Sequence, residues 1–578
     1  MPKLPNLTRV SDIRLSSSPV LEAWVYHFLT ENNIEHLLNP SIVASPEQLR
    51  FMVALQDDQL YVPCDDEVFS RIYQGRSEEL AQEYLKSWRF VIGLVHSYAM
   101  DKADASRILA LCRYRFRLFF DERTILPSRM IKRLVNIVLT QRGDPDPFRE
   151  KKRLANARAL EMIAEPAFQA LLRKCPDIAG HCVDIPQLRR ELDIVEMSRL
   201  MRLSTFEDIW NGAPSMAEIE KEIDGAENDC ACLRTVFAES NGESKKILFI
   251  PDVAGGFMFD VHLMLSLLRQ GHQLVLALKD AFYFNSPSVS DLDSDGLLKL
   301  ALEKAFVCTN EHLSKNELLQ LLRERQFVII SDGISEQLNL YRTSVSFSRA
   351  WKECDVVIAK GRRNSHVLMG TSHQFTRDVI CCWREETGKF HCALKPRAEW
   401  AVKFSEQDIL LQSKKIIRGM RQAKEAGKTI MFYSAIIGSI PGQTKTAIEL
   451  VNTFVAYLRD KLDNTYIINP AEHFEQGMDG DDLMYMWEHV QRSGLLDVWR
   501  FQTVEDIEMS FALMNQKVPS AWSGKDSTFS TGCTKEMRIA LDVQRNQPEL
   551  QIIGPAGEKF FRRRDYGIGK YYDATLKH

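Results

Sequence analysis

Long apolar runs, an excess of charge of one sign and paired cysteine motifs are all missing from this sequence. No window approaches the roughly eighteen uninterrupted apolar residues that a membrane-spanning helix needs. The N-terminal stretch MPKLPNLTRVSDIRLSSS lacks the apolar core of a secretion signal. The formal net charge of −4 gives no global attraction to nucleic acid or to an anionic membrane. We therefore expect a soluble, cytoplasmic protein with neither a membrane nor a nucleic-acid partner.

The twelve cysteines are scattered, and no two are spaced as a CxxC pair. Cys230 and Cys232 are separated by one residue, and Cys381 directly precedes Cys382. Neither spacing is that of a zinc knuckle. We interpret the cysteines as reduced thiols that serve mostly as small core residues, and we expect no structural zinc site.

The hydrophobic pattern changes along the 578 residues and predicts four segments. Apolar residues three and four apart predict an all-helical N-terminal domain over residues 1–205. A stretch rich in Gly, Asn and acidic residues predicts a linker over 206–244. Short strand-like runs alternating with amphipathic helices predict an α/β domain over 245–403, and a C-terminal α/β extension or second domain over 404–578.

Four apolar runs in the third segment, KILFIPD, QLVLALKD, FVIISDG and DVVIAKG, each end in a polar or glycine-bearing turn. A helical pattern follows each run. Alternating β and α elements are typical of a mainly parallel sheet covered on both faces. The fold class predicted is therefore α/β, a Rossmann-like doubly wound sheet preceded by the helical domain. Ligands of such sheets bind outside the carboxyl ends of the strands.

Two aspartates stand at this predicted edge. Asp252 ends the first strand and is followed by Gly255 and Gly256, which permit close backbone approach at the start of a helix. Asp291 lies in PSVSDLDSDG, ahead of another helix. The two carboxylates would suit a divalent cation. The alternative is that both are ordinary turn or helix-capping residues.

The same edge also carries candidate phosphate contacts. Lys360, Gly361 and Asn364 occupy the carboxyl end of the strand DVVIAKG, and Lys279 ends the strand QLVLALKD. An ammonium group and a side-chain amide can hold phosphate oxygens. A lysine at a strand end can equally be a solvent-exposed cap.

The ordered set of a strand-Asp-x-Ala-Gly loop, a later Ser-Asp and a strand ending Lys-Gly-x-x-Asn resembles the metal-dependent damage-control phosphatases. This family includes the acidic-residue methyltransferase-like (ARMT-like) domain. The resemblance covers residues 245–400 closely and the helical region in character. It implies one divalent metal, manganese, cobalt or nickel, and hydrolysis of small phosphometabolites such as sugar phosphates.

The resemblance also implies roles for single residues. Asp252 and Asp291 would be the metal ligands and, with Lys360, the catalytic residues. Lys360 would offset charge on the phosphate oxygens, and a carboxylate would accept a proton. The candidates for binding the phosphate would be Gly255, Lys279, Gly361 and Asn364.

The sequence departs from the family pattern after the first aspartate. The family usually places a metal-binding asparagine there, and this chain has Val253. Valine cannot coordinate a cation, so another ligand such as Asp260 would have to replace it. Two other functions therefore stay open. One is a methyltransferase that uses S-adenosylmethionine, with Asp280 near the ribose. The other is a non-catalytic phosphometabolite-binding protein on a degenerate phosphatase scaffold.

Overall fold

The structure is a computed structural model, and it describes residues 6–14, 18–32, 46–56, 58–75, 77–98, 100–175, 182–238, 243–308, 315–440, 443–473, 478 and 480–565. The chain divides into two compact units, Met1–Ala398 and Glu399–Asp573. Each unit is described by itself. No described helix is both long enough and apolar enough to cross a membrane.

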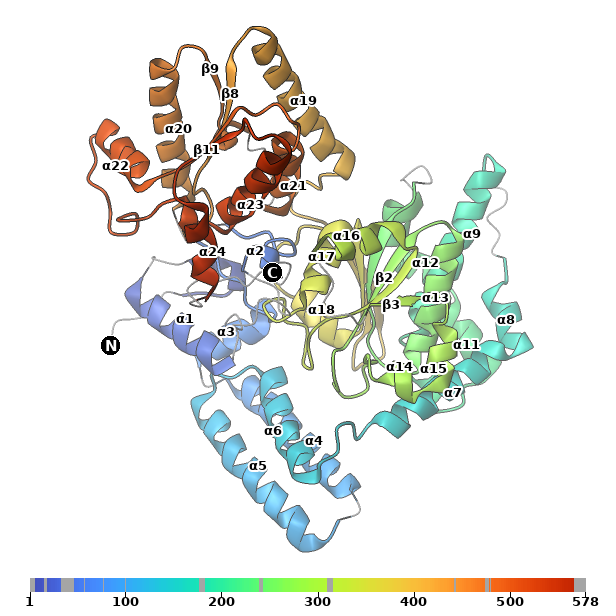
Figure 1. The fold of residues 1–578 in the computed structure, drawn as a ribbon. Coiled ribbons are helices and arrows are strands. Elements are labelled where there is room, and N and C mark those ends of the chain that lie inside the picture. Colours follow the sequence, from blue (N-terminus) through green and yellow to red (C-terminus); the bar gives the residue numbers. More distant parts are fainter. Residues whose placement is uncertain are drawn as a thin grey trace. The chain divides into compact units, whose positions relative to one another are not determined.

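The first unit begins with a series of helices (Figure 1). Their starts are fixed by short polar side chains: Asp101 accepts a hydrogen bond from the backbone N–H of Asp104, and Ser77 from that of Leu80. The elements are η1 (Val10–Asp12), α1 (Pro19–Asn32), α2 (Pro46–Leu49), α3 (Asp66–Gln74), α4 (Glu78–Ser97), α5 (Lys102–Glu122), α6 (Pro127–Arg142), α7 (Arg149–Ala164), α8 (Pro166–Leu172), α9 (Ile185–Leu203), α10 (Asp208–Asn211), α11 (Met216–Ile223), α12 (Ala226–Asp229) and the π-helical turn η3 (Arg234–Ala238).

A seven-stranded sheet follows, in the order β3-β4-β2-β1-β5-β6-β7. All neighbouring strands are parallel except β7, which is antiparallel to β6. The strands are β1 (Lys246–Ile250), β2 (Gln273–Leu278), β3 (Phe306–Val307), β4 (Phe327–Ser331), β5 (Val356–Lys360), β6 (Asp378–Arg384) and β7 (Phe390–Lys395). The chain winds outward from β1 in one direction through β2 and in the other through β5. The topological switch point therefore lies between β1 and β5.

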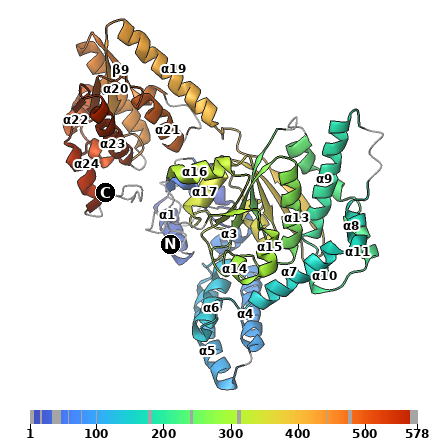
Figure 2. The same ribbon diagram turned by 45° about the vertical axis from the view of Figure 1, so that its right-hand side comes forward.

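Helices cover both faces of this sheet. They are α13 (Gly256–Arg269), α14 (Asp291–Ser294), α15 (Gly296–Ala301), α16 (Lys315–Glu324), α17 (Val345–Glu353) and α18 (Arg362–Leu368). Figures 1 and 2 show α16 and α17 on one face and α13 on the other. Side chains of β1 alternate between two cores: Leu248 and Ile250 pack with α17, and Ile247 and Phe249 with α13. A strand buried on both faces explains the uninterrupted apolar run in its sequence.

The second unit has a four-stranded parallel sheet of its own, in the order β11-β10-β8-β9. Its strands are β8 (Thr429–Ser434), β9 (Thr465–Ile468), β10 (Val498–Phe501) and β11 (Gln551–Ile553). Its helices are α19 (Glu406–Glu425), α20 (Thr444–Lys461), η4 (Pro470–His473), α21 (Gly480–Gln491), α22 (Val504–Leu513), η5 (Ser527–Phe529), α23 (Thr531–Asn546) and α24 (Gly557–Asp565).

The predicted fold class is confirmed, because a mostly parallel sheet with helices on both faces follows an N-terminal helical region. The proposed segment boundaries stay predictions. The stretch predicted as a linker, 206–244, contains α10, α11, α12 and η3. The glycines there cap these short helices, Gly212 at the end of α10 and Gly225 before α12, whereas several of the acidic residues lie inside α11 and α12.

Candidate functional site

Asp252 and Gly361 meet at the topological switch point. Asp252 follows β1, and Gly361 follows β5, the neighbouring strand. Gly361 has φ +87°, and a Cβ atom placed on it would lie 1.9 Å from Cγ of Asp252. Only glycine leaves room for the carboxylate at this point. The structure therefore brings these two predicted site residues into direct contact.

Asp252 is partly accessible, with 27% of its side chain exposed. Burial raises the pKa of the Asp252 carboxyl group, while the positive charge of Arg363 acts in the opposite direction. The guanidinium of Arg363 lies 3.7 Å from the carboxylate and also stacks over the ring of Tyr283, with 5.0 Å between Cζ and the ring centroid. Asp252 thus has a cationic neighbour that sequence analysis did not identify.

The two glycines after Asp252 approach protein rather than open space. A Cβ atom on Gly255 would lie 2.4 Å from Cγ of Trp210, and one on Gly256 would lie 2.2 Å from the carbonyl oxygen of Ser204. The backbone N–H of Gly255 donates to Oδ1 of Asn156 at 2.8 Å. The close backbone approach expected of this loop is therefore an approach to the helical region of the same unit.

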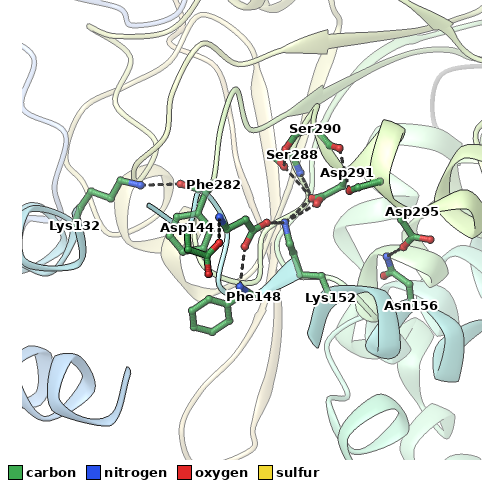
Figure 3. Close-up of polar contacts among 12 residues, drawn as sticks. Lys132, Asp144, Phe148, Lys152, Asn156, Phe282, Ser288, Ser290, Asp291 and Asp295 are labelled. Atoms are coloured by element: carbon green, nitrogen blue, oxygen red, sulfur yellow. Dashed lines mark hydrogen bonds and ion pairs between the residues drawn. The ribbon is translucent and has the colours of Figure 1, made fainter. Parts of the chain in front are cut away.

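Asp291 is held by a lysine from α7 (Figure 3). Nζ of Lys152 donates to both carboxylate oxygens of Asp291 at 2.7 Å, and it also pairs with Asp146 at 2.7 Å. Ser288 donates to Oδ2 of Asp291 from its backbone N–H and from its hydroxyl group. Only 4% of the Lys152 side chain is exposed. The ammonium group of Lys152 thus stands between two buried carboxylates.

Lys360 lies beneath the sheet edge and is almost fully buried. Its Nζ donates to the carbonyl oxygen of Met201 at 2.9 Å and lies 3.7 Å from Asp260. Burial raises the pKa of Asp260 to about 6, and the charge of Lys360 opposes this rise. The ammonium group that was predicted to contact phosphate therefore already has internal partners.

The remaining predicted phosphate contacts also bind within the protein. Asn364 donates to the carbonyl oxygen of Lys360 at 2.8 Å. Lys279 forms an ion pair with Asp332 at 2.7 Å. These contacts fix the ends of β5 and β2 at the sheet edge. The phosphate-binding roles of these residues stay predictions.

The metal site stays a prediction as well. Asp252 and Asp291 have different partners, Arg363 for the first and Lys152 with Ser288 for the second. Among the residues that the structure describes, no group of three or more His, Cys, Asp and Glu side chains is arranged to hold a metal ion.

A pocket lies beside Asp291, with about 280 Å³ of empty space that includes open solvent. One stripe of α7 supplies much of its lining: Arg149, Lys152, Arg153 and Asn156. These four residues have the i, i+3, i+4, i+7 spacing of one helix face. The opposite wall includes Ala254, Asp291 and Asp295, and Asn156 donates to Asp295 at 2.9 Å. This polar stripe was readable in the sequence, but it was interpreted there only as part of the all-helical N-terminal domain.

Residues 91–405 match the family model of the damage-control phosphatase ARMT1-like domain. A crystal structure of a DUF89 family protein from Pyrococcus horikoshii is similar to this chain, with 18% sequence identity and a TM-score of 0.38. That similarity covers 55% of this chain and 97% of the Pyrococcus protein. A search of curated proteins finds no match.

Proposed function

Since the chain belongs to the damage-control phosphatase ARMT1-like family, we propose that it hydrolyses a small phosphorylated metabolite bound in the pocket beside α7. The observation that carries this proposal is the charge of the α7 stripe. Arg149, Lys152 and Arg153 line one small pocket within the matched region. Lys152 is held between Asp146 and Asp291, so the two guanidinium groups are the candidates for contact with an incoming phosphate group. Arginine and lysine side chains are suited to bind phosphate oxygens and to offset their charge.

Asp252 keeps its catalytic role in this proposal; the residue of its loop that lines the pocket is Ala254, two positions along the chain. Its carboxylate lies at the carboxyl edge of the sheet, is partly exposed and has a raised pKa, which suits a group that accepts a proton from water. Arg363 stabilises the charged form of Asp252 between turnovers. Sugar phosphates are the compact substrates that the resemblance implies.

The donor set does not fit the divalent cation that the resemblance implies. Lys152 contacts both oxygens of Asp291, and Ser288 donates twice to one of them. Val253 supplies no donor beside Asp252. A cation could bind Asp291 only after the Lys152 ammonium group had left it. The proposed reaction therefore uses only the side chains of the protein and water.

The contact between Lys152 and Asp291 favours a second function, a protein that binds the phosphorylated metabolite without hydrolysing it. The Lys152 ammonium group offsets the charge of Asp291, and Arg149 and Arg153 also line the pocket. Such a site can still bind an anion, although Asp291, the predicted metal ligand, is paired with Lys152.

A phosphate-release screen on a panel of sugar phosphates, run without added metal and with manganese, cobalt, nickel or magnesium, tests the proposal. We expect release by the wild type that is lost in Asp252→Asn and weakened in Arg149→Gln. Lys151→Gln is the matched control, because Lys151 is exposed on α7 and does not line the pocket. Thermal stabilisation by sugar phosphates in the absence of any release would instead establish the second function.

The variant Lys152→Met tests whether the Lys152 ammonium group prevents a divalent cation from binding Asp291. The variant removes the ammonium group from between Asp146 and Asp291, so we expect a loss of stability of about 3–5 kcal/mol. We also expect manganese to raise the melting temperature of Lys152→Met more than that of the wild type, because a cation can then bind the freed carboxylates. Equal responses in the two proteins would contradict competition between Lys152 and a cation.

A further inference from the structure

Four of the twelve cysteines gather in one place, although the sequence scatters them. Cys230 and Cys232 lie between α12 and η3, Cys382 is on β6 and Cys392 on β7. Sγ of Cys392 lies 3.0 Å from Sγ of Cys382 and 3.5 Å from Sγ of Cys232. Cys230 also hydrogen-bonds with Cys392. Cys392 is thus the centre of the cluster.

The backbone already places two of these thiols at bonding distance. Cys382 and Cys392 are directly opposite each other in the antiparallel pair of β6 and β7. Residues opposite each other in such a pair have Cα atoms about 4.5–5.5 Å apart, within the range of about 4.4–6.8 Å that a disulfide spans. The Cys232–Cys392 contact joins residues 160 positions apart in the chain. A bond there would cross-link the helical region to the edge strand β7.

The thiols differ in reactivity. Cys230 and Cys382 are fully buried, whereas Cys232 and Cys392 are partly accessible. The hydrogen bond from Cys392 lowers the pKa of Cys232, and backbone N–H groups at residues 232 and 233 act in the same direction. The pKa of Cys392 is raised by its side-chain hydrogen bonds with the other three thiols and by burial. Cys232 is therefore the nucleophile of the cluster, and Cys392 is the thiol placed to resolve its oxidised form.

Sulfur–sulfur chemistry explains this cluster better than metal binding does. Within the described part of the chain, no group of His, Cys, Asp and Glu side chains is arranged to hold a metal ion. The sulfur atoms of Cys382 and Cys232 lie 3.0 and 3.5 Å from that of Cys392, and such close spacing suits a dithiol that cycles between reduced and oxidised forms.

We propose that Cys232 and Cys392 form a peroxide-sensitive thiol–disulfide site. The Cys232 thiolate attacks hydrogen peroxide, breaks the O–O bond and becomes a sulfenic acid, with hydroxide as the leaving group. The Cys392 thiol then attacks this sulfur, and the S–S bond forms as the hydroxyl group leaves as water. Two electrons pass in total from the two sulfurs to the peroxide. Cys382 can next attack the Cys392 sulfur, which forms the Cys382–Cys392 bond and releases the Cys232 thiolate.

This site is independent of the proposed phosphatase activity, and a peptide map tests it without any substrate. Full-length protein is treated with dilute hydrogen peroxide, free thiols are alkylated, and the protein is digested with trypsin without reduction. The sequence predicts that residues 222–234 carry Cys230 and Cys232, that 390–397 carry Cys392, and that 378–384 carry Cys381 and Cys382. We expect 222–234 to be linked to 390–397, or 378–384 to 390–397 after exchange, and both links to vanish after reduction.

Three variants assign the bond. Cys232→Ser should abolish both links, because it removes the thiolate that reacts first. Cys230→Ser should retain them, and Cys175→Ser is the control for an exposed cysteine outside the cluster. The melting temperature of each variant shows whether it folds. If a variant does not fold, the peptide map of the wild type alone shows whether a disulfide forms between these peptides.

Two results would overturn the proposal. One is full alkylation of Cys232 and Cys392 in the peroxide-treated wild type, with no link between the peptides. The other is a purified protein that holds stoichiometric zinc and whose four cluster thiols react only after a chelator is added. The second result would make the cluster a thiolate metal site instead.

Discussion

Gly361 is the residue on which the geometry at the switch point depends. It combines a positive φ with a position where the Asp252 carboxylate occupies the space that a Cβ atom would need. A methyl group at this position would meet the Asp252 side chain before any other atom. The energetic cost of the positive φ can be separated from the cost of the clash with Asp252. The chain contains a second glycine with nearly the same φ, at which an added Cβ atom would contact nothing.

We expect Gly361→Ala to cost more stability than Gly388→Ala. Gly388 has φ +85°, close to the +87° of Gly361, but a Cβ atom there meets nothing within 4 Å. The control should show only the backbone penalty of about 1–2 kcal/mol, and Gly361→Ala should lose about 1–3 kcal/mol more through the clash with Asp252. Chemical denaturation of both variants measures the difference. Equal losses would show that Asp252 moves aside freely.

Single residues at the sheet edge were predictable from sequence only in part. The order of strands and turns placed Asp252 and Gly361 at one edge, and they do meet there. Lys360 was assigned to the same edge, yet its side chain points into the core beside Asp260 and Met201. Strand residues alternate between two faces, and both faces of this sheet are buried, so the sequence pattern did not reveal the direction of Lys360.

At the scale of elements, α7 is the helix that connects the helical region to the sheet edge. Asn156 makes two of these connections, because it accepts from the buried N–H of Gly255 and donates to Asp295. Lys152, one turn earlier, makes the connection to Asp291. The helix thus holds both loops that carry the predicted aspartates.

We expect Asn156→Ala to destabilise the first unit by about 1–3 kcal/mol, because it leaves the buried N–H of Gly255 without an acceptor. Asn211→Ala is the matched control: Asn211 is exposed and hydrogen-bonds with Glu207 at 3.3 Å. Denaturant midpoints of the two variants provide the comparison. A loss no larger in Asn156→Ala than in the control would show that water replaces the amide at Gly255.

The role of α7 could not be predicted from periodicity. The helix was expected, but its polar stripe matters only because the loops at 252–256 and 287–295 lie against it. Such contacts join residues about a hundred or more positions apart, for example 139 positions between Lys152 and Asp291. The four cysteines of the cluster were missed for the same reason. Local pattern predicts an element, whereas its partners depend on tertiary packing.

At the scale of the whole molecule, two units with separate sheets and cores predict unfolding in more than one step. The second unit contains a buried carboxyl group, that of Glu536. Glu536 on α23 is 7% exposed, and burial raises its pKa from 4.5 to about 7, against hydrogen bonds from Ser434 and Gln491. The folded state therefore binds a proton that the unfolded state releases between pH 4.5 and 7.

We expect the second unit to lose stability as the pH rises from 4.5 to 7, by at most about 3 kcal/mol from Glu536 alone. This contribution is complete below pH 4.5 and lost as the pH passes 7. Glu536→Gln should remove it, and Glu549→Gln, at an exposed position of the same unit, should not. Calorimetry across this pH range measures the effect. An unchanged pH profile in Glu536→Gln would contradict it.

Trp210 fills the space above Gly255 that would face water in an isolated sheet domain. A fragment that started at residue 245 would lose this indole, the carbonyl oxygen of Ser204 and the amide of Asn156 together. Two adjacent glycines would then recover their full conformational freedom, and the turn after Asp252 would no longer have one shape. Contacts from the helices before the sheet therefore determine the conformation of that turn. The shortest chain that preserves this conformation must begin before α7.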